Sequence, residues 1–68
     1  MPDTFAARLQ ALRLQAGLSV YALAAKTGLS RQYLGALESG KKEPSLETAR
    51  HIAAALGKGL AVWDQSTA

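Results

Sequence analysis

The stretch LSVYALAAKTGLSRQYLGALESG, from Leu18 to Gly40, decides the fold of this chain. Its apolar spacing predicts two short helices joined by a tight turn, over residues 20–27 and 31–39. Ser19 and Ser30 stand directly before these helices, where a hydroxyl oxygen accepts a hydrogen bond from a backbone N–H that has no partner within the helix. The stretch therefore carries its own signals for where each helix begins.

The turn between the two helices contains Gly28, which adopts a left-handed conformation without a Cβ clash and so ends the first helix. Spacings of one and three residues place one set of apolar side chains on a buried face: Leu23, Ala24, Leu29, Leu34 and Leu37. The second helix presents a different set to solvent: Arg31, Gln32, Tyr33, Gly35 and Ala36. A helix pair with Arg and Gln exposed on its second helix is the shape that enters the major groove of DNA.

The charge distribution favours the same interpretation. The formal net charge is +3 and the sequence pI is about 9.7. Basic residues lie in or just after the second helix and on either side of it: Arg31, Lys41 and Lys42, with Arg8, Arg13 and Lys26 flanking. A basic margin around an exposed helix is the electrostatic footprint of a phosphate backbone. The alternative is an ordinary solvated surface.

The composition favours one all-α domain over residues 1–68, because alanine and leucine dominate and no useful strand pattern precedes residue 60. The chain has no Cys and a single His, which excludes disulfides, thiolate metal sites and His-rich metal sites. We expect no metal, no cofactor and no enzyme, since no close carboxylate pair suggests a catalytic cleft. Without an apolar run of roughly 20 residues or a signal peptide, we expect a cytoplasmic protein that does not enter membranes.

Two further helices are predicted around the central pair, over residues 5–16 and 45–56. Thr4 and Ser45 are their expected N-caps, and Asp3 and Glu47 are placed favourably for the helix dipole. The first helix is expected to bury Phe5, Leu9, Leu12 and Ala16, and the last helix Leu46, Ala49, Ile52, Ala53 and Leu56. We expect Arg8 and His51 on the surface and Arg13 at the edge of the apolar stripe.

The apolar run Leu60-Ala61-Val62-Trp63 is ambiguous, because four residues do not distinguish a helix from a strand. We expect a short fifth helix over residues 60–64, and a strand is the alternative. Leu60, Val62 and Trp63 supply more apolar surface than a small core buries, which makes them the candidate dimer contact. Residues 65–68 are expected to fray.

A set of residues in fixed register resembles a known family: Arg13, Gly17-Leu18-Ser19, Leu23-Ala24, Thr27-Gly28-Leu29-Ser30, Leu34, Leu37-Glu38-Ser39-Gly40, Pro44-Ser45, Ile52-Ala53 and Leu56-Gly57. The pattern covers about residues 5 to 64 and is similar to the phage-repressor family of helix-turn-helix domains, the Cro/cI or XRE type. The resemblance implies a five-helix, lambda-repressor-like fold that binds operator DNA, usually as a two-fold dimer.

The resemblance also implies roles for individual residues. Ser30, Arg31, Gln32 and Ala36 lie at positions that contact base edges in this family, and Gly35 lies beside them on the same side of the helix. Arg13 and Glu38 resemble an internal ion pair that ties the first helix to the end of the third. Phosphate contacts are expected from the starts of the two central helices and from the loop that follows them: Ser19, Tyr21, Tyr33, Lys41 and Lys42.

One position departs from the family pattern. Many members have Gln at the start of the second helix, where it contacts a phosphate, whereas this chain has Val20. That contact is therefore lost or moved to Tyr21 or to backbone N–H groups. Gly35 and Ala36 also lack the polar groups that some relatives carry, so direct base contacts are expected to depend on Arg31 and Gln32.

These observations predict a sequence-specific transcriptional regulator, most often a repressor, that binds double-stranded DNA as a homodimer. Arg31 has the geometry to bind guanine O6 and N7, Gln32 suits adenine N6 and N7, and Ala36 suits a thymine methyl. The alternative is an antitoxin-type module that holds a toxin-like partner protein through residues 60–64, either together with DNA or instead of it.

Overall fold

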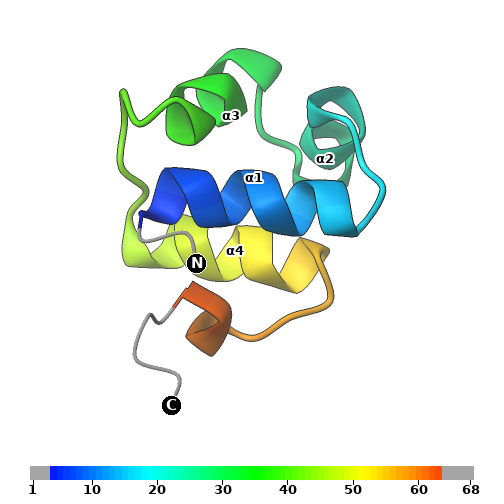
Figure 1. Cartoon of the computed structure of the whole chain (residues 1–68), viewed down its shortest axis with the longest axis vertical. Coiled ribbons are helices and arrows are strands. Elements are labelled where there is room, and N and C mark those ends of the chain that lie inside the picture. Colours follow the sequence, from blue (N-terminus) through cyan, green and yellow to red (C-terminus); the bar gives the residue numbers. More distant parts are fainter. Residues whose placement is uncertain (1–3, 64–68) are drawn as a thin grey trace.

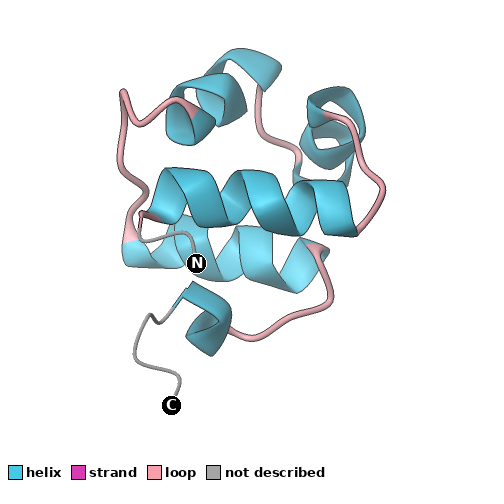
Figure 2. Ribbon diagram, viewed as in Figure 1, coloured by secondary structure: helices cyan, strands magenta, loops and turns pink. Residues whose placement is uncertain are grey.

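The computed structural model describes residues 4–63, and every regular element in that range is helical (Figure 2). The elements are α1 (Phe5–Gln15), α2 (Val20–Thr27), α3 (Arg31–Glu38), α4 (Leu46–Ala55) and the 3₁₀ helix η1 (Leu60–Trp63). The predicted all-α class is confirmed. The predictions for Asp3 and for residues 64–68 lie outside the described residues.

Helix α3 packs against α1 and α2, and α2 also packs against α4. In Figure 1, α1 crosses the middle of the molecule, with α2 and α3 on one side of it. Helix α4 lies on the other side, and η1 packs against α4. This arrangement leaves one flank of α3 free of any other described element, so α3 is available to an external partner.

The core joins all four α-helices. Its largest completely buried side chains are Leu9 of α1, Leu23 of α2, Leu34 and Leu37 of α3, and Ile52 of α4. Full burial of one such side chain contributes about 1.5–3 kcal/mol to the free energy of unfolding. Because α3 contributes two of these five residues, its orientation is fixed by the core.

All four predicted N-caps are present. The side-chain oxygens of Thr4, Ser19, Ser30 and Ser45 accept hydrogen bonds from the backbone N–H groups of Ala7, Ala22, Tyr33 and Thr48, at 3.0–3.1 Å. Gly28 ends α2 with φ of +75°, the left-handed conformation expected for it. The boundaries of α2 therefore match the prediction.

The other helices are slightly shorter than predicted, because the expected end residues are caps. Ala16 and Ser39 follow α1 and α3, while Ser45 and Leu56 flank α4. Ala16 is exposed, and so is Leu46, at 66%. Both predictions of burial were wrong for one reason: each residue lies at an end of its apolar stripe, where the packing of neighbouring helices stops.

The apolar run at residues 60–63 forms a 3₁₀ helix, in which the N–H of Val62 donates to Gly59 O at 3.0 Å. A segment this short is typical of 3₁₀ rather than α geometry. Its Trp63 ring lies 4.4 Å from the Phe5 ring, centroid to centroid, and its indole N–H donates to Ala49 O at 2.8 Å. Thus η1 connects α1 to α4.

Arg8 was predicted on the surface, and the structure corrects this. It is half-buried, and its Nη1 donates to Val62 O at 3.4 Å. The reason is the packing of η1 beside α1, which the sequence pattern did not indicate.

Candidate nucleic-acid interface

Helix α3 has two distinct faces, as its apolar spacing predicts. Leu34 and Leu37 are completely buried, whereas Arg31, Gln32 and Gly35 are exposed. Tyr33 and Ala36 were predicted to be exposed but are half-buried at the margin between these faces, and Tyr33 packs against the core. The core thus fixes one side of the helix while the opposite side is presented to solvent.

The turn between α2 and α3 is held by Thr27. Its hydroxyl donates to Leu23 O at 2.9 Å and accepts from the Leu29 N–H at 3.2 Å. Its carbonyl oxygen accepts a 2.6 Å hydrogen bond from Nε2 of His51, which lies on α4. His51 is exposed as predicted, but it also fixes the turn. The spacing of the sequence did not indicate the hydrogen bond from His51, because it depends on the packing of α4 against α2.

Arg13 and Glu38 form an ion pair in two hydrogen bonds. Arg13 Nε and Nη2 lie 2.6 and 3.1 Å from the two carboxylate oxygens of Glu38. The third nitrogen of the guanidinium, Nη1, donates to Leu18 O at 2.8 Å. The hydrogen bonds to Glu38 raise the pKa of Arg13 above its ordinary value, against the opposing effect of burial. Arg13 therefore connects α1, the segment before α2 and the end of α3.

The same ion pair determines which charges remain on the exposed face of α3. Glu38 is the acidic residue of this helix, and its carboxylate is bound to Arg13 rather than to water or to an external group. Arg13, which was predicted at the edge of the apolar stripe, is buried, at 8% exposure. The exposed face of α3 consequently carries Arg31 without a neighbouring negative charge from its own helix.

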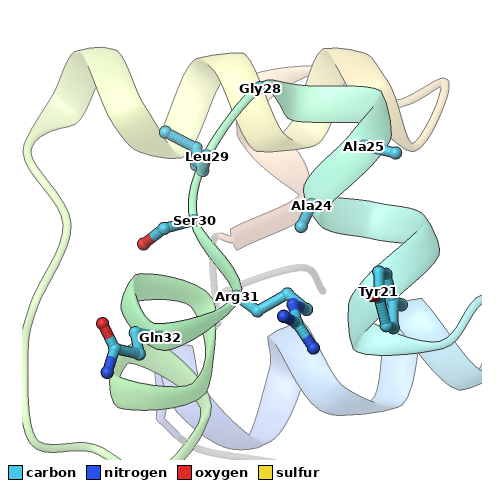
Figure 3. A pocket seen from close by; sticks show the side chains of 8 residues that line it. All are labelled: Tyr21, Ala24, Ala25, Gly28, Leu29, Ser30, Arg31 and Gln32. Atoms are coloured by element: carbon cyan, nitrogen blue, oxygen red, sulfur yellow. The ribbon is translucent and has the colours of Figure 1, made fainter.

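An open hollow of about 830 Å³ is lined by α2, by the turn that follows it and by the start of α3. Figure 3 shows its lining: Tyr21, Ala24, Ala25, Gly28, Leu29, Ser30, Arg31 and Gln32. Arg31 Cζ lies 4.1 Å from the centroid of the Tyr21 ring. The side chain of Gln32 extends away from this pair (Figure 3), so Arg31 and Gln32 leave the helix in different directions.

The far end of α3 carries a second pair of a cation and an aromatic ring. Lys42 Nζ lies 6.0 Å from the centroid of the Tyr33 ring. The backbone N–H groups of Lys41 and Lys42 both donate to Ala36 O, at 2.9 and 3.3 Å, which holds the loop close to α3. Both lysine side chains are exposed. Positive charge therefore borders the exposed face of α3 at both ends.

Ser19 and Ser30 are exposed at the starts of α2 and α3. Each hydroxyl oxygen already accepts a hydrogen bond from its own helix, from Ala22 N–H and Tyr33 N–H respectively. A hydroxyl that accepts still has its own proton to donate. Either serine is thus able to donate to an oxygen atom of a ligand without losing the helix cap.

The predicted dimer residues lie in a different part of the molecule. Leu60, Val62 and Trp63 belong to η1, across α1 from α3 in Figure 1, and all three are half-buried within the chain. The structure therefore does not bring them together with the residues on α3. Trp63 was predicted as surplus apolar surface, and its indole instead contacts Phe5 and Ala49.

Residues 4–63 contain neither a cluster of metal-ligating side chains nor a membrane-spanning helix. No group of three or more His, Cys, Asp or Glu side chains in this range is arranged to hold a metal ion. Within the same range, no helix combines the length and the apolar character needed to cross a bilayer.

A family model described as helix-turn-helix matches residues 9–63. An uncharacterized HTH-type transcriptional regulator of Sinorhizobium fredii is 41% identical over 46 residues, a match that covers 68% of this chain and 60% of the regulator. The chain thus spans less than two thirds of that relative.

Solved structures share the fold. An HTH_3 family transcriptional regulator from Vibrio cholerae superposes with a TM-score of 0.85 at 34% identity, covering 90% of this chain and 34% of the regulator. The restriction-modification controller protein C.AhdI from Aeromonas hydrophila superposes with a TM-score of 0.83 at 37% identity. The match covers 87% of this chain and 89% of the controller. A chain of a SinR protein/SinI protein complex superposes with a TM-score of 0.83 at 24% identity. The match covers 94% of this chain and 64% of that chain, and it supports the fold alone.

Proposed function

This chain belongs to the helix-turn-helix family, in its XRE-type branch, and from that membership we propose that it binds double-stranded DNA at specific sequences and regulates transcription. The observation that carries the proposal is the division of α3 into a buried and an exposed side. Leu34 and Leu37 hold the helix in the core, while Arg31 and Gln32 remain free to enter a major groove.

Base contacts come from the first turn of α3. Arg31 donates to guanine O6 and N7, and Gln32 bonds adenine N6 and N7. Because these two side chains diverge, they contact different base pairs rather than one. Ser30 donates at the start of the helix, Ala36 meets a thymine methyl, and Gly35 permits a close approach of the helix backbone to the bases.

Phosphate contacts surround these base contacts and set the register of the protein on the duplex. Lys41 and Lys42 bind one strand beyond the end of α3, with the hydroxyl of Tyr33 beside them. Ser19 and Tyr21 bind the backbone at the start of α2, where the helix dipole favours a negative charge. Both sets border the exposed face of α3, which supports a single continuous interface.

A single α3 helix contacts few base pairs, so we propose a homodimer that binds two half-sites about 34–36 Å apart. The dimer contact remains assigned to η1 through Leu60 and Val62. Bound at a promoter, such a dimer represses transcription by occupying the site and needs no catalytic group. Sedimentation velocity over a range of concentrations tests the dimer, and a monomer at all concentrations would remove it.

The proposed function is tested by selecting binding sites from random duplexes at two salt concentrations. The expected result is enrichment of a two-fold symmetric motif, with affinity falling steeply as salt rises. A matched selection with Arg31→Ala is expected to lose the preference at one base pair of each half-site. A folded wild-type protein that enriches no motif would overturn the proposal.

The alternative, an antitoxin-type module that holds a partner protein through residues 60–64, receives less support. The indole of Trp63 is engaged with Phe5 and Ala49 of its own chain. A partner that binds this segment would contact its exposed Ala61 and the half-buried Leu60 and Val62, without the hydrogen-bonded indole N–H. Purification of the chain together with its neighbouring gene products distinguishes this alternative from DNA binding by itself.

A further inference from the structure

The contact between Tyr21 and Arg31 joins two elements at the proposed interface. Tyr21 lies in the first turn of α2, and Arg31 is the first residue of α3. The guanidinium carbon lies over the phenol ring, 4.1 Å from its centroid, and Figure 3 shows the two side chains pointing toward each other. This distance is well within the range of a cation–π interaction.

The Tyr21 ring is otherwise unusual for its position. It is 66% exposed, and the other large hydrophobic side chains exposed by more than half in residues 4–63 are Leu46 and Leu14. Of these three, Tyr21 is the one in contact with a predicted base-contacting residue. The guanidinium of Arg31 therefore packs on a ring that the core leaves largely uncovered.

The contact leaves the hydrogen-bonding capacity of Arg31 available. In the part of the chain that the structure describes, no carboxylate forms an ion pair with Arg31. A ring face attracts the guanidinium through its quadrupole and needs no oxygen acceptor. The donors that guanine O6 and N7 require are thus not used by acceptors of the protein.

We propose that Tyr21 is a positioning residue for Arg31: its ring holds the guanidinium in one orientation before DNA arrives, and so determines how strongly one base pair is distinguished from the others. The inference rests on the proposed function. An arginine side chain loses considerable rotamer freedom on binding, and a preformed orientation reduces that loss. Only a base that Arg31 contacts in this orientation gains affinity from the smaller entropy loss. The effect therefore appears as a larger difference in affinity between the matching base pair and the others.

This role is separate from the phosphate contact proposed for the same residue. The ring positions Arg31, whereas the phenolic hydroxyl donates to the DNA backbone. Tyr21→Phe removes the second function and keeps the first, and Tyr21→Leu removes both. Comparing the two variants therefore separates the effect of the ring from the effect of the hydroxyl. Leu14→Ala is the control, because it removes an exposed apolar side chain from α1.

The DNA experiment compares the Kd for the selected duplex with the Kd for a duplex altered at the base pair that Arg31→Ala identifies. Tyr21→Leu is expected to reduce this discrimination about three- to thirtyfold. The lower figure corresponds to the loss of a cation–π contact that is exposed to water, and the higher figure to the loss of one that is desolvated. Tyr21→Phe and Leu14→Ala should retain it. In an Arg31→Ala background, Tyr21→Leu should cause no further loss of discrimination. Equal weakening of both duplexes by Tyr21→Leu, or loss of discrimination in Tyr21→Phe, would overturn the positioning role.

A measurement without DNA keeps this inference distinct from the proposed function. In the free protein, the aromatic ring shifts the proton resonances of the Arg31 side chain, and these shifts should persist in Tyr21→Phe and disappear in Tyr21→Leu. Thermal melting of each variant checks that it is folded. Intact shifts together with no DNA binding by wild type would reject the function and hence the role in discrimination. Absent shifts in wild type would reject the positioning role by itself.

Discussion

Arg31 and Lys41 represent the two kinds of contact that the proposed interface needs. Arg31 has a planar set of donors that match one base, while Lys41 offers a compact charge that suits any phosphate. Both side chains are exposed, at the start of α3 and in the loop after it. Substituting each should therefore change a different measured property of DNA binding.

Arg31→Ala is expected to weaken binding to the selected duplex by about 1–3 kcal/mol, because the bidentate contact to guanine is lost. Binding to random duplexes should change much less. Competition titrations with both kinds of duplex measure the difference. Equal losses on the two would show that Arg31 contacts the backbone and not a base.

Lys41→Ala is expected to weaken binding to all duplexes nearly alike and to lower the slope of log K against log salt by about one unit. The reason is that one fewer counterion is released on binding. Lys58→Ala, in the exposed segment between α4 and η1, is the matched control and should leave the slope unchanged. If Lys41→Ala also leaves it unchanged, Lys41 is not a phosphate contact.

At the level of elements, α3 is held by the core on one side and has a glycine on its exposed side. Gly35 lies within the helix, and a Cβ built at this position meets no atom within 4 Å. Internal packing therefore gives no reason for a glycine in α3. An external contact, as in the close approach of the helix to a groove, remains the explanation that we propose.

Gly35→Ala is expected to raise the free energy of unfolding by about 0.5–1 kcal/mol, because alanine is the better helix former and the site is open. The same substitution should weaken DNA binding, since the added methyl meets the groove. Chemical denaturation and DNA titration measure the two effects. Ala11→Gly, an exposed position of α1, should lower stability without altering affinity. Unchanged DNA affinity in Gly35→Ala would remove Gly35 from the interface.

The ion pair between Arg13 and Glu38 links α1 to the end of α3, with both side chains only 10% exposed. Glu38→Ala is expected to lower the free energy of unfolding by about 3–5 kcal/mol, because it leaves a buried guanidinium without its carboxylate. Glu43→Ala, in the exposed loop, should change it by less than about 0.5 kcal/mol. Urea denaturation measures both. A loss below about 1 kcal/mol for Glu38→Ala would mean that the pair behaves as a surface salt bridge.

At the level of the whole molecule, η1 closes the bundle opposite α3. Trp63 contacts Phe5 of α1 and hydrogen-bonds Ala49 of α4, so a four-residue element joins the first and last α-helices. In a chain of 68 residues the core is small, and a contact of this size is a substantial part of the net stability. The segment therefore stabilises the domain that presents α3.

Trp63→Ala is expected to lower the free energy of unfolding by about 2–4 kcal/mol, somewhat less than for a completely buried tryptophan. Trp63→Phe keeps an aromatic ring beside Phe5 and loses the hydrogen bond to Ala49 O, so its loss should be about 1 kcal/mol. Thermal and urea denaturation give both values. Full stability in Trp63→Ala would show that the indole belongs to a contact outside the chain.

The sequence by itself determined most of the helices and the two faces of α3. Caps such as Ser30, stops such as Gly28 and the spacing of Leu34 and Leu37 act over one or two turns, so neighbouring residues contain the information. The pairing of Arg13 with Glu38 was indicated by resemblance to a family and not by local spacing, since the two residues lie far apart in the chain. Their geometry comes from the structure alone.

Only the tertiary structure decided how the helices use their remaining side chains. It placed Trp63 on Ala49, His51 on Thr27 and Arg31 on Tyr21, and it left Leu46 in solvent. Each of these outcomes depends on which element lies beside a given residue. Periodicity states which side of a helix is buried, but the distances between helices determine which atoms meet, and those distances exist only once the whole core has packed.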